Sequence, residues 1–299
     1  MNLVVAMLLA GVHYVTVGGL GGEPDYEQRF QALAAEVEKL VKDAPGVASA
    51  ITLSGPSATK SAVLQALNRV LTSADDDLIV TLIGHGTFDG VDYKFNLPGP
   101  DLTAGELAAA LNQRPARRQV VILATSASGA AIAALQRPGR VVVSATRSGG
   151  ERNATVFGRF WVEALRDPSA DTDKNELVSV LEAYRFADQK TAEYYASQKR
   201  LATEHALLED TGDGEGVRNP APENRKGLLA GQVALVRRGG AMTAAQTPEK
   251  LALVQKRQEL ESRIDQLKYR KAALPADEYK KTMRELLLEL ARLQEEIDR

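Results

Sequence analysis

The sequence predicts an α/β fold with a mostly parallel sheet flanked by helices on both faces, followed by a C-terminal antiparallel helical hairpin. Three observations support this prediction. Strand-like apolar runs alternate with amphipathic, helix-like segments over residues 12–237, which is the pattern of a parallel sheet with crossover helices. Several strand-like runs are almost continuously apolar, as expected where both faces of a strand are covered. From residue 249 onward, apolar residues recur with heptad spacing.

The predicted strands are short runs rich in β-branched residues. They cover Val12–Val17, Ala48–Leu53, Leu78–Ile83, Gln119–Ala124, Arg140–Ala145 and Leu228–Val236. The predicted helices show apolar residues three or four positions apart. They cover Tyr26–Lys42, Ser57–Ser73, Leu102–Leu111, Ala127–Leu135, Val156–Leu165 and Asn175–Leu208. In such sheets, functional groups gather at the carboxyl ends of the strands.

The last fifth of the chain has the pattern of a coiled coil. Four leucines are seven residues apart before Pro275, and the apolar residues after it step alternately by four and three. Proline suits the first turn of a new helix. We therefore expect two antiparallel helices of about 25 residues, each about 37 Å long. The domains are predicted as a 12–240 α/β domain and a 247–299 hairpin, with the linker between them.

Composition excludes several classes of function. The formal net charge is −2 and aromatic residues are only 5% of the chain, so neither charge nor base stacking favours a nucleic-acid partner. The chain has no cysteine and three histidines. Disulfides and thiolate metal sites are therefore excluded, and we expect no metal and no cofactor.

The N-terminus leaves two interpretations open. Leu3–Val12 is a continuous apolar run that is too short to span a membrane. Residues 1–11 resemble the remnant of a signal peptide without its basic region, which predicts a periplasmic or secreted protein. The alternative is an extended first strand, which suits a cytoplasmic protein equally well.

Two strand ends carry candidate catalytic residues. The run Leu78–Ile83 leads into Gly84-His85-Gly86, and Gln119–Ala124 leads into Thr125-Ser126. If the two strands are neighbours, His85 and Ser126 lie at one edge of the sheet as a base and a nucleophile. The backbone N–H of Gly86 is then a candidate oxyanion donor. A pair of tight turns with a structural His and Ser is the alternative.

These segments resemble the caspase/legumain-like peptidases. That family places a His-Gly pair after one strand and an Ala-Cys pair, followed by glycine, after the next. Thr125-Ser126-Ala127-Ser128-Gly129 is similar to the legumain pattern, with Ser126 at the position of the cysteine. Further segments are similar to the family in the same order: Gly19–Gly22 with Tyr26, Asn96–Pro98, Ser144–Arg152 and Gly158–Trp161. The resemblance covers roughly residues 12–237 and implies a peptidase fold.

Two departures from the family bear on activity. A hydroxyl is much less acidic than a thiol, which titrates near 8.5, so a serine in this geometry should lose most activity. This predicts a pseudopeptidase that binds a peptide or protein. A serine-dependent peptidase and an engineered Cys→Ser form of an active enzyme remain as alternatives. The residue after Tyr26 is Glu27 where legumains have arginine, so asparagine specificity does not carry over. Arg147 and Arg152 resemble the arginines of the substrate groove.

Three further predictions concern the rest of the chain. The hairpin is expected to be a surface for self-association or for docking on a partner, and a structural protein acting through it is the third candidate function. His205 is expected at the surface, near the end of a long helix. The acidic segment Asp210–Gly216 hints at a calcium loop, but Ala221 stands where the twelve-residue loop needs its closing Glu. The residues therefore favour a plain polar loop there.

Overall fold

The protein is described here by a computed structural model, which covers residues 11–70, 72–237 and 248–297. Its centre is a six-stranded sheet in the order β10-β8-β7-β3-β1-β2. The strands are β1 Val12–Gly18, β2 Val47–Leu53, β3 Asp77–Gly84, β7 Arg118–Thr125, β8 Arg140–Ser144 and β10 Leu207–Glu209. All pairs are parallel except that of β10 with β8. The predicted fold class is therefore confirmed, with one antiparallel edge strand.

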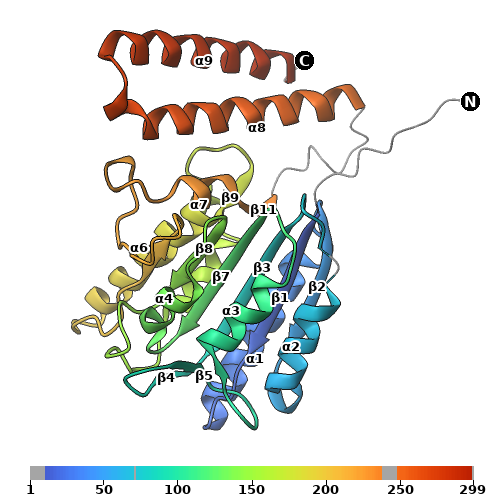
Figure 1. The fold of residues 1–299 in the computed structure, drawn as a ribbon, viewed down its shortest axis with the longest axis vertical. Coiled ribbons are helices and arrows are strands. Elements are labelled where there is room, and N and C mark those ends of the chain that lie inside the picture. Colours follow the sequence, from blue (N-terminus) through green and yellow to red (C-terminus); the bar gives the residue numbers. More distant parts are fainter. Residues whose placement is uncertain (1–10, 71, 238–247, 298–299) are drawn as a thin grey trace, which may run out of the picture.

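Helices cover both faces of the sheet (Figure 1). One face packs against α1 Pro24–Val41, α5 Phe157–Ala164 and α6 Val180–Ser197. The other face packs against α2 Lys60–Arg69, α3 Ala104–Asn112 and α4 Ile132–Leu135. Successive residues of β3 alternate between the two cores, with Ile79 in the first and Val80 in the second, because side chains of a strand point to opposite faces. This explains why the central strands are apolar throughout.

Two small sheets were not predicted. The first joins β4 Gly86–Phe88, β5 Tyr93–Phe95 and β6 Leu102–Thr103, and it lies beyond the carboxyl end of β3. The second pairs β9 Leu177–Ser179 with β11 Ala234–Arg237. The remaining short elements are α7 Leu228–Gln232 and the 3-10 turns Gly55–Ser57, Ser128–Ala131, Pro168–Ala170, Pro222–Asn224 and Lys271–Ala273.

The C-terminal hairpin consists of α8 Pro248–Tyr269 and α9 Ala276–Ile297. Leu260, Ile264 and Leu267 of α8 are buried against Leu286 and Leu293 of α9, as the heptad pattern predicts. The hairpin lies across the end of the sheet opposite to β4 and β5 (Figure 1). Hydrogen bonds join the described residues of the hairpin to the α/β domain there: Tyr269 donates to the carbonyl of Lys226, Arg257 donates to the carbonyl of Asn175, and Gln232 donates to the Ser262 hydroxyl.

Two predicted elements differ from the structure by more than a few residues at their ends. The helix expected over Asn175–Leu208 begins at Val180 and ends at Ser197, because residues 177–179 pair with β11 and residues 207–209 pair with β8. The strand expected over Leu228–Val236 begins with helix α7 and becomes extended only at Ala234. The predicted linker over 239–247 and most of the N-terminal segment 1–11 lie outside the described residues. In the described part of the chain, no helix combines the length and apolar character that crossing a membrane requires.

Candidate functional site

The candidate site lies at the carboxyl ends of the neighbouring strands β3 and β7. Their register pairs Gly84 with Thr125, so His85 and Ser126 follow directly at adjacent positions. The two turns are in close contact: a side chain on Gly86 would place its Cβ 2.5 Å from the Ser126 carbonyl oxygen and 2.6 Å from the Tyr93 ring. Only glycine fits at that position. The condition of the prediction, that the two strands are neighbours, is therefore met, and the sheet brings His85 and Ser126 to one edge.

Ser126 is enclosed by this packing. The residue is only 2% exposed. Its Oγ accepts a long hydrogen bond, 3.4 Å, from the backbone N–H of Gly86. Both residues of the predicted dyad belong to the described part of the chain, and within it His85 makes no hydrogen bond to Ser126. The donor predicted to stabilise an oxyanion thus points at the hydroxyl itself.

His85 is held instead by the first helix. Its ring lies edge-on to the rings of Tyr26 and Phe30, with centroid distances of 4.8 and 5.0 Å. Burial and the nearby positive charge of Arg29 lower the pKa of His85, against the opposing effects of a hydrogen bond to the Gly21 backbone and of Glu23. The imidazole is therefore neutral at neutral pH, the protonation state that a general base needs, but it faces aromatic rings.

The turn after Ser126 is fixed to the loop that follows β8. Ala127 adopts a left-handed conformation, with φ of 56°, and its N–H donates to the carbonyl of Glu151 at 2.8 Å. The Gly129 N–H donates to Thr146 Oγ1 at 3.0 Å. A Cβ at Gly129 would lie 2.3 Å from the carbonyl carbon of Arg147. These contacts pack residues 126–129 and 146–151 as one unit.

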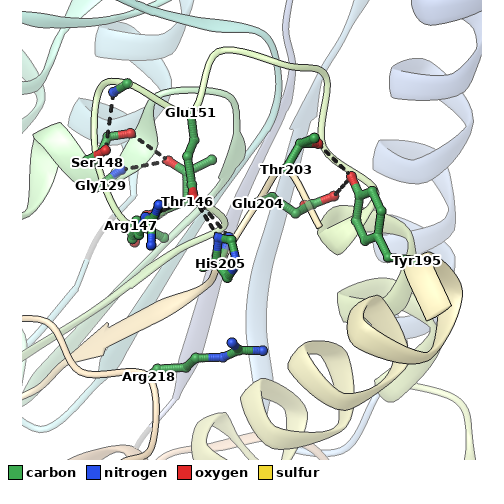
Figure 2. Close-up of polar contacts among 12 residues, drawn as sticks. Gly129, Thr146, Arg147, Ser148, Glu151, Tyr195, Thr203, Glu204, His205 and Arg218 are labelled. Atoms are coloured by element: carbon green, nitrogen blue, oxygen red, sulfur yellow. Dashed lines mark hydrogen bonds and ion pairs between the residues drawn. The ribbon is translucent and has the colours of Figure 1, made fainter. Parts of the chain in front are cut away.

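Glu151 connects this unit to a more distant segment (Figure 2). Its carboxylate lies 2.5 Å from Nδ1 of His205 and 3.1 Å from Nε of Arg147. It also accepts the backbone N–H groups of both of these residues. His205 is half-buried in the segment between α6 and β10, so the expectation of a surface histidine near the end of a helix is wrong. Sequence reasoning missed this cluster because its members are 54 positions apart.

A second buried carboxylate fixes the start of α5. Glu204 Oε1 accepts the backbone N–H of Val156 at 2.8 Å, and Oε2 accepts that of Phe157 at 3.1 Å. Oε1 also accepts a hydrogen bond from the Tyr195 hydroxyl. Burial raises the pKa of Glu204, against these hydrogen bonds. Figure 2 shows this group beside the Glu151 cluster. Two carboxylates thus fix the segment 203–205 to its neighbours: Glu204 bonds to the start of α5, and Glu151 bonds to His205.

The predicted substrate-binding residues have different surroundings. Both Glu27 oxygens are engaged: one accepts the Gly21 N–H at 2.7 Å and the other accepts the Gln31 amide at 2.8 Å. Glu27 therefore closes the loop after β1. Arg147 is exposed and paired with Glu151. Arg152 is exposed, and its side chain makes no ion pair or hydrogen bond with the described residues. Its guanidinium is available to a ligand carboxylate.

Metal-binding potential lies elsewhere in the molecule. Among the described residues, one group of three side chains could hold an ion: Asp171, Asp173 and Glu182. Asp171 and Asp173 lie in the loop before α6 and Glu182 lies in its first turn, and Arg257 of α8 contacts Asn175 in the same loop. It is not part of the His85–Ser126 edge.

The fold is a mostly parallel α/β sheet, and His85 and Ser126 lie directly after two adjacent strands of it. No protein-family model matches the chain, and no curated protein sequence matches it. The chain is similar to the solved structure of the Drosophila initiator caspase Dronc, with 9% identity and a TM-score of 0.46, over 69% of this chain and 82% of that one. It is also similar to caspase-1 from Spodoptera frugiperda, with 10% identity and a TM-score of 0.45, over 68% and 87% of the two chains. Likenesses of this degree do not assign the chain to a family.

Proposed function

We propose that the protein is a caspase/legumain-like pseudopeptidase that binds a peptide or protein without cleaving it. The observation that carries the proposal is the state of Ser126. The side chain is buried, its Oγ accepts a hydrogen bond from Gly86, and it makes no hydrogen bond to His85. A serine nucleophile needs a base within hydrogen-bond reach, about 2.6–3.2 Å. Here His85 does not bond to the Ser126 hydroxyl, and the Gly86 N–H, the predicted oxyanion donor, is already bonded to it.

Ligand binding is proposed for the loop that follows β8. Arg152 is exposed and free of ion pairs with the described residues, and Arg147 is exposed beside it. Guanidinium groups bind carboxylates and peptide carbonyls through paired N–H donors. The packing of residues 146–151 against 126–129 holds this loop in place. A peptide or protein with an acidic residue is therefore the proposed ligand class.

The test of inactivity is a comparison of the wild-type chain with Ser126→Cys. The wild type should hydrolyse no member of a broad peptide library and should not react with a fluorophosphonate. A thiol is a far better nucleophile at neutral pH, so turnover by Ser126→Cys alone would locate the loss of activity in the nucleophile. Ser148→Cys, which places a thiol on the neighbouring exposed loop, is the matched control and should stay silent.

The opposite outcome identifies the serine-dependent peptidase. Hydrolysis by the wild type that disappears in both Ser126→Ala and His85→Ala would overturn the pseudopeptidase proposal. Loss of binding of an acidic peptide in Arg152→Gln, with binding kept in Arg159→Gln on α5, would support the proposed ligand site. Equal binding by both variants would contradict it.

A second candidate function, as an interaction protein, is favoured by the outer surface of the hairpin. Leu287 and Leu288 of α9 are 49% and 53% exposed. Ser126 contacts Gly86 of β4, and the hairpin lies across the end of the sheet opposite to β4 and β5 (Figure 1). If the hairpin carries function through self-association, Leu287→Glu with Leu288→Glu should lower the sedimentation mass, and Ser126→Ala should not. A monomeric wild type would exclude self-association.

A further inference from the structure

The loop between α5 and α6 carries an arrangement that the peptidase-like site does not use. Asp171 and Asp173 lie in this loop, and Glu182 lies in the first turn of α6. One carboxylate oxygen of each residue lies within 4.8 Å of the others. Oxygens bound to one Ca²⁺ at about 2.3–2.6 Å are at most about 5 Å apart. Three oxygens within this distance of one another can therefore bind one Ca²⁺. A loop that offers several carboxylate, amide and carbonyl oxygens suits Ca²⁺ better than Mg²⁺, which usually keeps several of its waters.

The linear order of the residues is a separate observation that points to the same ion. Residues 171–182 read Asp-Thr-Asp-Lys-Asn-Glu-Leu-Val-Ser-Val-Leu-Glu. A calcium loop of the EF-hand type has oxygen ligands at positions 1, 3 and 5, a backbone carbonyl at 7, a polar residue at 9 and a bidentate Glu at 12. This segment supplies an acid, an acid and an amide at the first three of these positions, a serine at the ninth and Glu182 at the twelfth. The match comes from the sequence alone and is independent of the distances.

The sequence departs from the calcium-loop pattern at the sixth position, but the backbone there has the conformation that the pattern requires. Position 6 is glycine in the pattern because the chain turns sharply there, and here it is Glu176. Its φ is nevertheless 66°, and that of Lys174 at position 4 is 58°. The loop also leads directly into helix α6, as a calcium loop leads into its exiting helix. On the entering side the chain has only the 3-10 turn Pro168–Ala170, so the site is a calcium loop without a full helix pair.

We propose that residues 171–182 bind one Ca²⁺ through the carboxylates of Asp171, Asp173 and Glu182, the side-chain oxygen of Asn175 and the backbone carbonyl of Leu177. Glu182 is buried, at 7% exposure, and its carboxylate caps α6 by accepting the Ser179 N–H and hydroxyl. Its other oxygen accepts the Thr172 N–H and hydroxyl, so the two hydroxyl groups turn away where an ion binds the carboxylate. The site lies where the hairpin meets the α/β domain, because Arg257 of α8 donates to the Asn175 carbonyl at 2.9 Å. Bound Ca²⁺ therefore fixes the loop on which α8 rests.

The test is isothermal titration of the full chain, freed of metal with a chelator, with CaCl₂ alone. One Ca²⁺ should bind, with a dissociation constant between about 10⁻⁵ M, the value of the weakest sensor loops, and about 10⁻³ M, that of the weakest extracellular calcium modules. Glu182→Gln keeps a side chain that can cap α6 but removes the bidentate carboxylate. Asp171→Asn removes one charge at the first ligand. Each should weaken binding at least about 10-fold.

The matched control is Asp213→Asn, in the other acidic loop of the chain. Lys226 donates to Asp213 and to Glu209 in that loop, so an ammonium group already lies between its carboxylates, and the variant should bind Ca²⁺ as the wild type does. If Glu182→Gln unfolds, Asp173→Asn at an exposed position gives the same test. Absence of binding up to about 10 mM Ca²⁺, beyond the weakest natural loops, would overturn the proposal. Unchanged binding in Asp171→Asn and Glu182→Gln, or its loss in Asp213→Asn, would overturn it too.

Discussion

Two acidic loops of this protein neutralise their charge in different ways. In residues 209–213, the buried ammonium of Lys226 contacts Glu209, Thr211 and Asp213. In residues 171–182, the carboxylates of Asp171, Asp173 and Glu182 form the cluster that we propose binds Ca²⁺. They accept hydrogen bonds from the backbone and from neutral side chains of the same segment. One loop therefore carries its own cation, and the other has the pattern to bind one from solution.

The pKa values of the carboxyl groups differ between the two loops for this reason. The hydrogen bond from Lys226 lowers the pKa of Asp213 to about 2. Desolvation, followed by the charge of Glu182, raises the pKa of Asp173 to about 6, although part of that residue is exposed. Carboxylates packed together need a positive charge to stay ionised. The number of acidic residues in a loop therefore does not show whether the loop binds an ion. What decides it is whether a lysine of the chain lies between the carboxylates, as Lys226 does in residues 209–213.

The largest effect is expected where the built-in cation is removed. Lys226 is only 3% exposed, and Lys226→Met leaves Glu209, which is fully buried, without its partner. Removing one member of a buried ion pair costs about 3–5 kcal/mol of unfolding free energy. Urea unfolding of the full chain measures this change. Lys268→Met, at an exposed pair with Asp265, should leave the midpoint almost unchanged. Equal midpoints for the two variants would remove the distinction between the loops.

The second effect concerns the loop without a lysine. Ca²⁺ at about 100 times its dissociation constant should stabilise the wild type by about 2.7 kcal/mol, because it binds only the folded chain. Urea unfolding with and without Ca²⁺ gives this difference. It should vanish in Glu182→Gln and persist in Asp213→Asn. Stabilisation of all three proteins by the same amount would mean that the ion acts elsewhere.

The third effect is the pH dependence of stability in the presence of a chelator. The pKa of Asp173 is raised in the folded protein, to about 6, so the folded chain binds more protons than the unfolded chain, and stability falls as pH rises between about 4 and 6. Asp213 has the opposite sign: its lowered pKa contributes stability at neutral pH that is lost only as pH falls from about 4 toward 2. Unfolding midpoints at about pH 4.5 and 7 should therefore differ less in Asp173→Asn than in the wild type. Asp213→Asn should keep the wild-type difference over this range, and a parallel shift in both variants would contradict the assignment.

Much of the fold was predictable because its signals are local. Continuous apolar runs identified the central strands, and the heptad identified the hairpin seam that buries Leu260 and Leu286. That His85 and Ser126 share one edge of the sheet was predicted only on the condition that their strands are neighbours, and the pairing of β3 with β7 meets that condition. The small sheet of β4, β5 and β6 was missed because two of its strands have three residues and one has two. Such short strands carry too little periodicity to distinguish them from loops.

The state of the candidate site could not be predicted, because residues from other elements decide it. The His85 ring is oriented by Tyr26 and Phe30 of α1. Glu151 is bonded to His205, far along the chain. The loop over 171–182 was hidden for another reason: a helix was expected from Asn175, and the pattern lacks its usual glycine at residue 176. The backbone nevertheless adopts the turn that glycine normally provides.

That substitution gives the smallest and most local prediction. A non-glycine residue in the left-handed conformation costs about 1–2 kcal/mol, and glycine loses more entropy on folding, about 0.5–1 kcal/mol. With φ of 66° at Glu176, Glu176→Gly should stabilise the protein by less than about 1 kcal/mol and should tighten Ca²⁺ binding by pre-forming the loop. The matched control is Glu215→Gly, two residues after the loop in which Lys226 contacts the carboxylates. Glu215 is not among the residues with positive φ, so glycine there should only destabilise the protein. Urea unfolding and calcium titration measure both variants. Since a calcium loop needs the turn at its sixth position, weaker Ca²⁺ binding by Glu176→Gly would contradict the proposed ligand order.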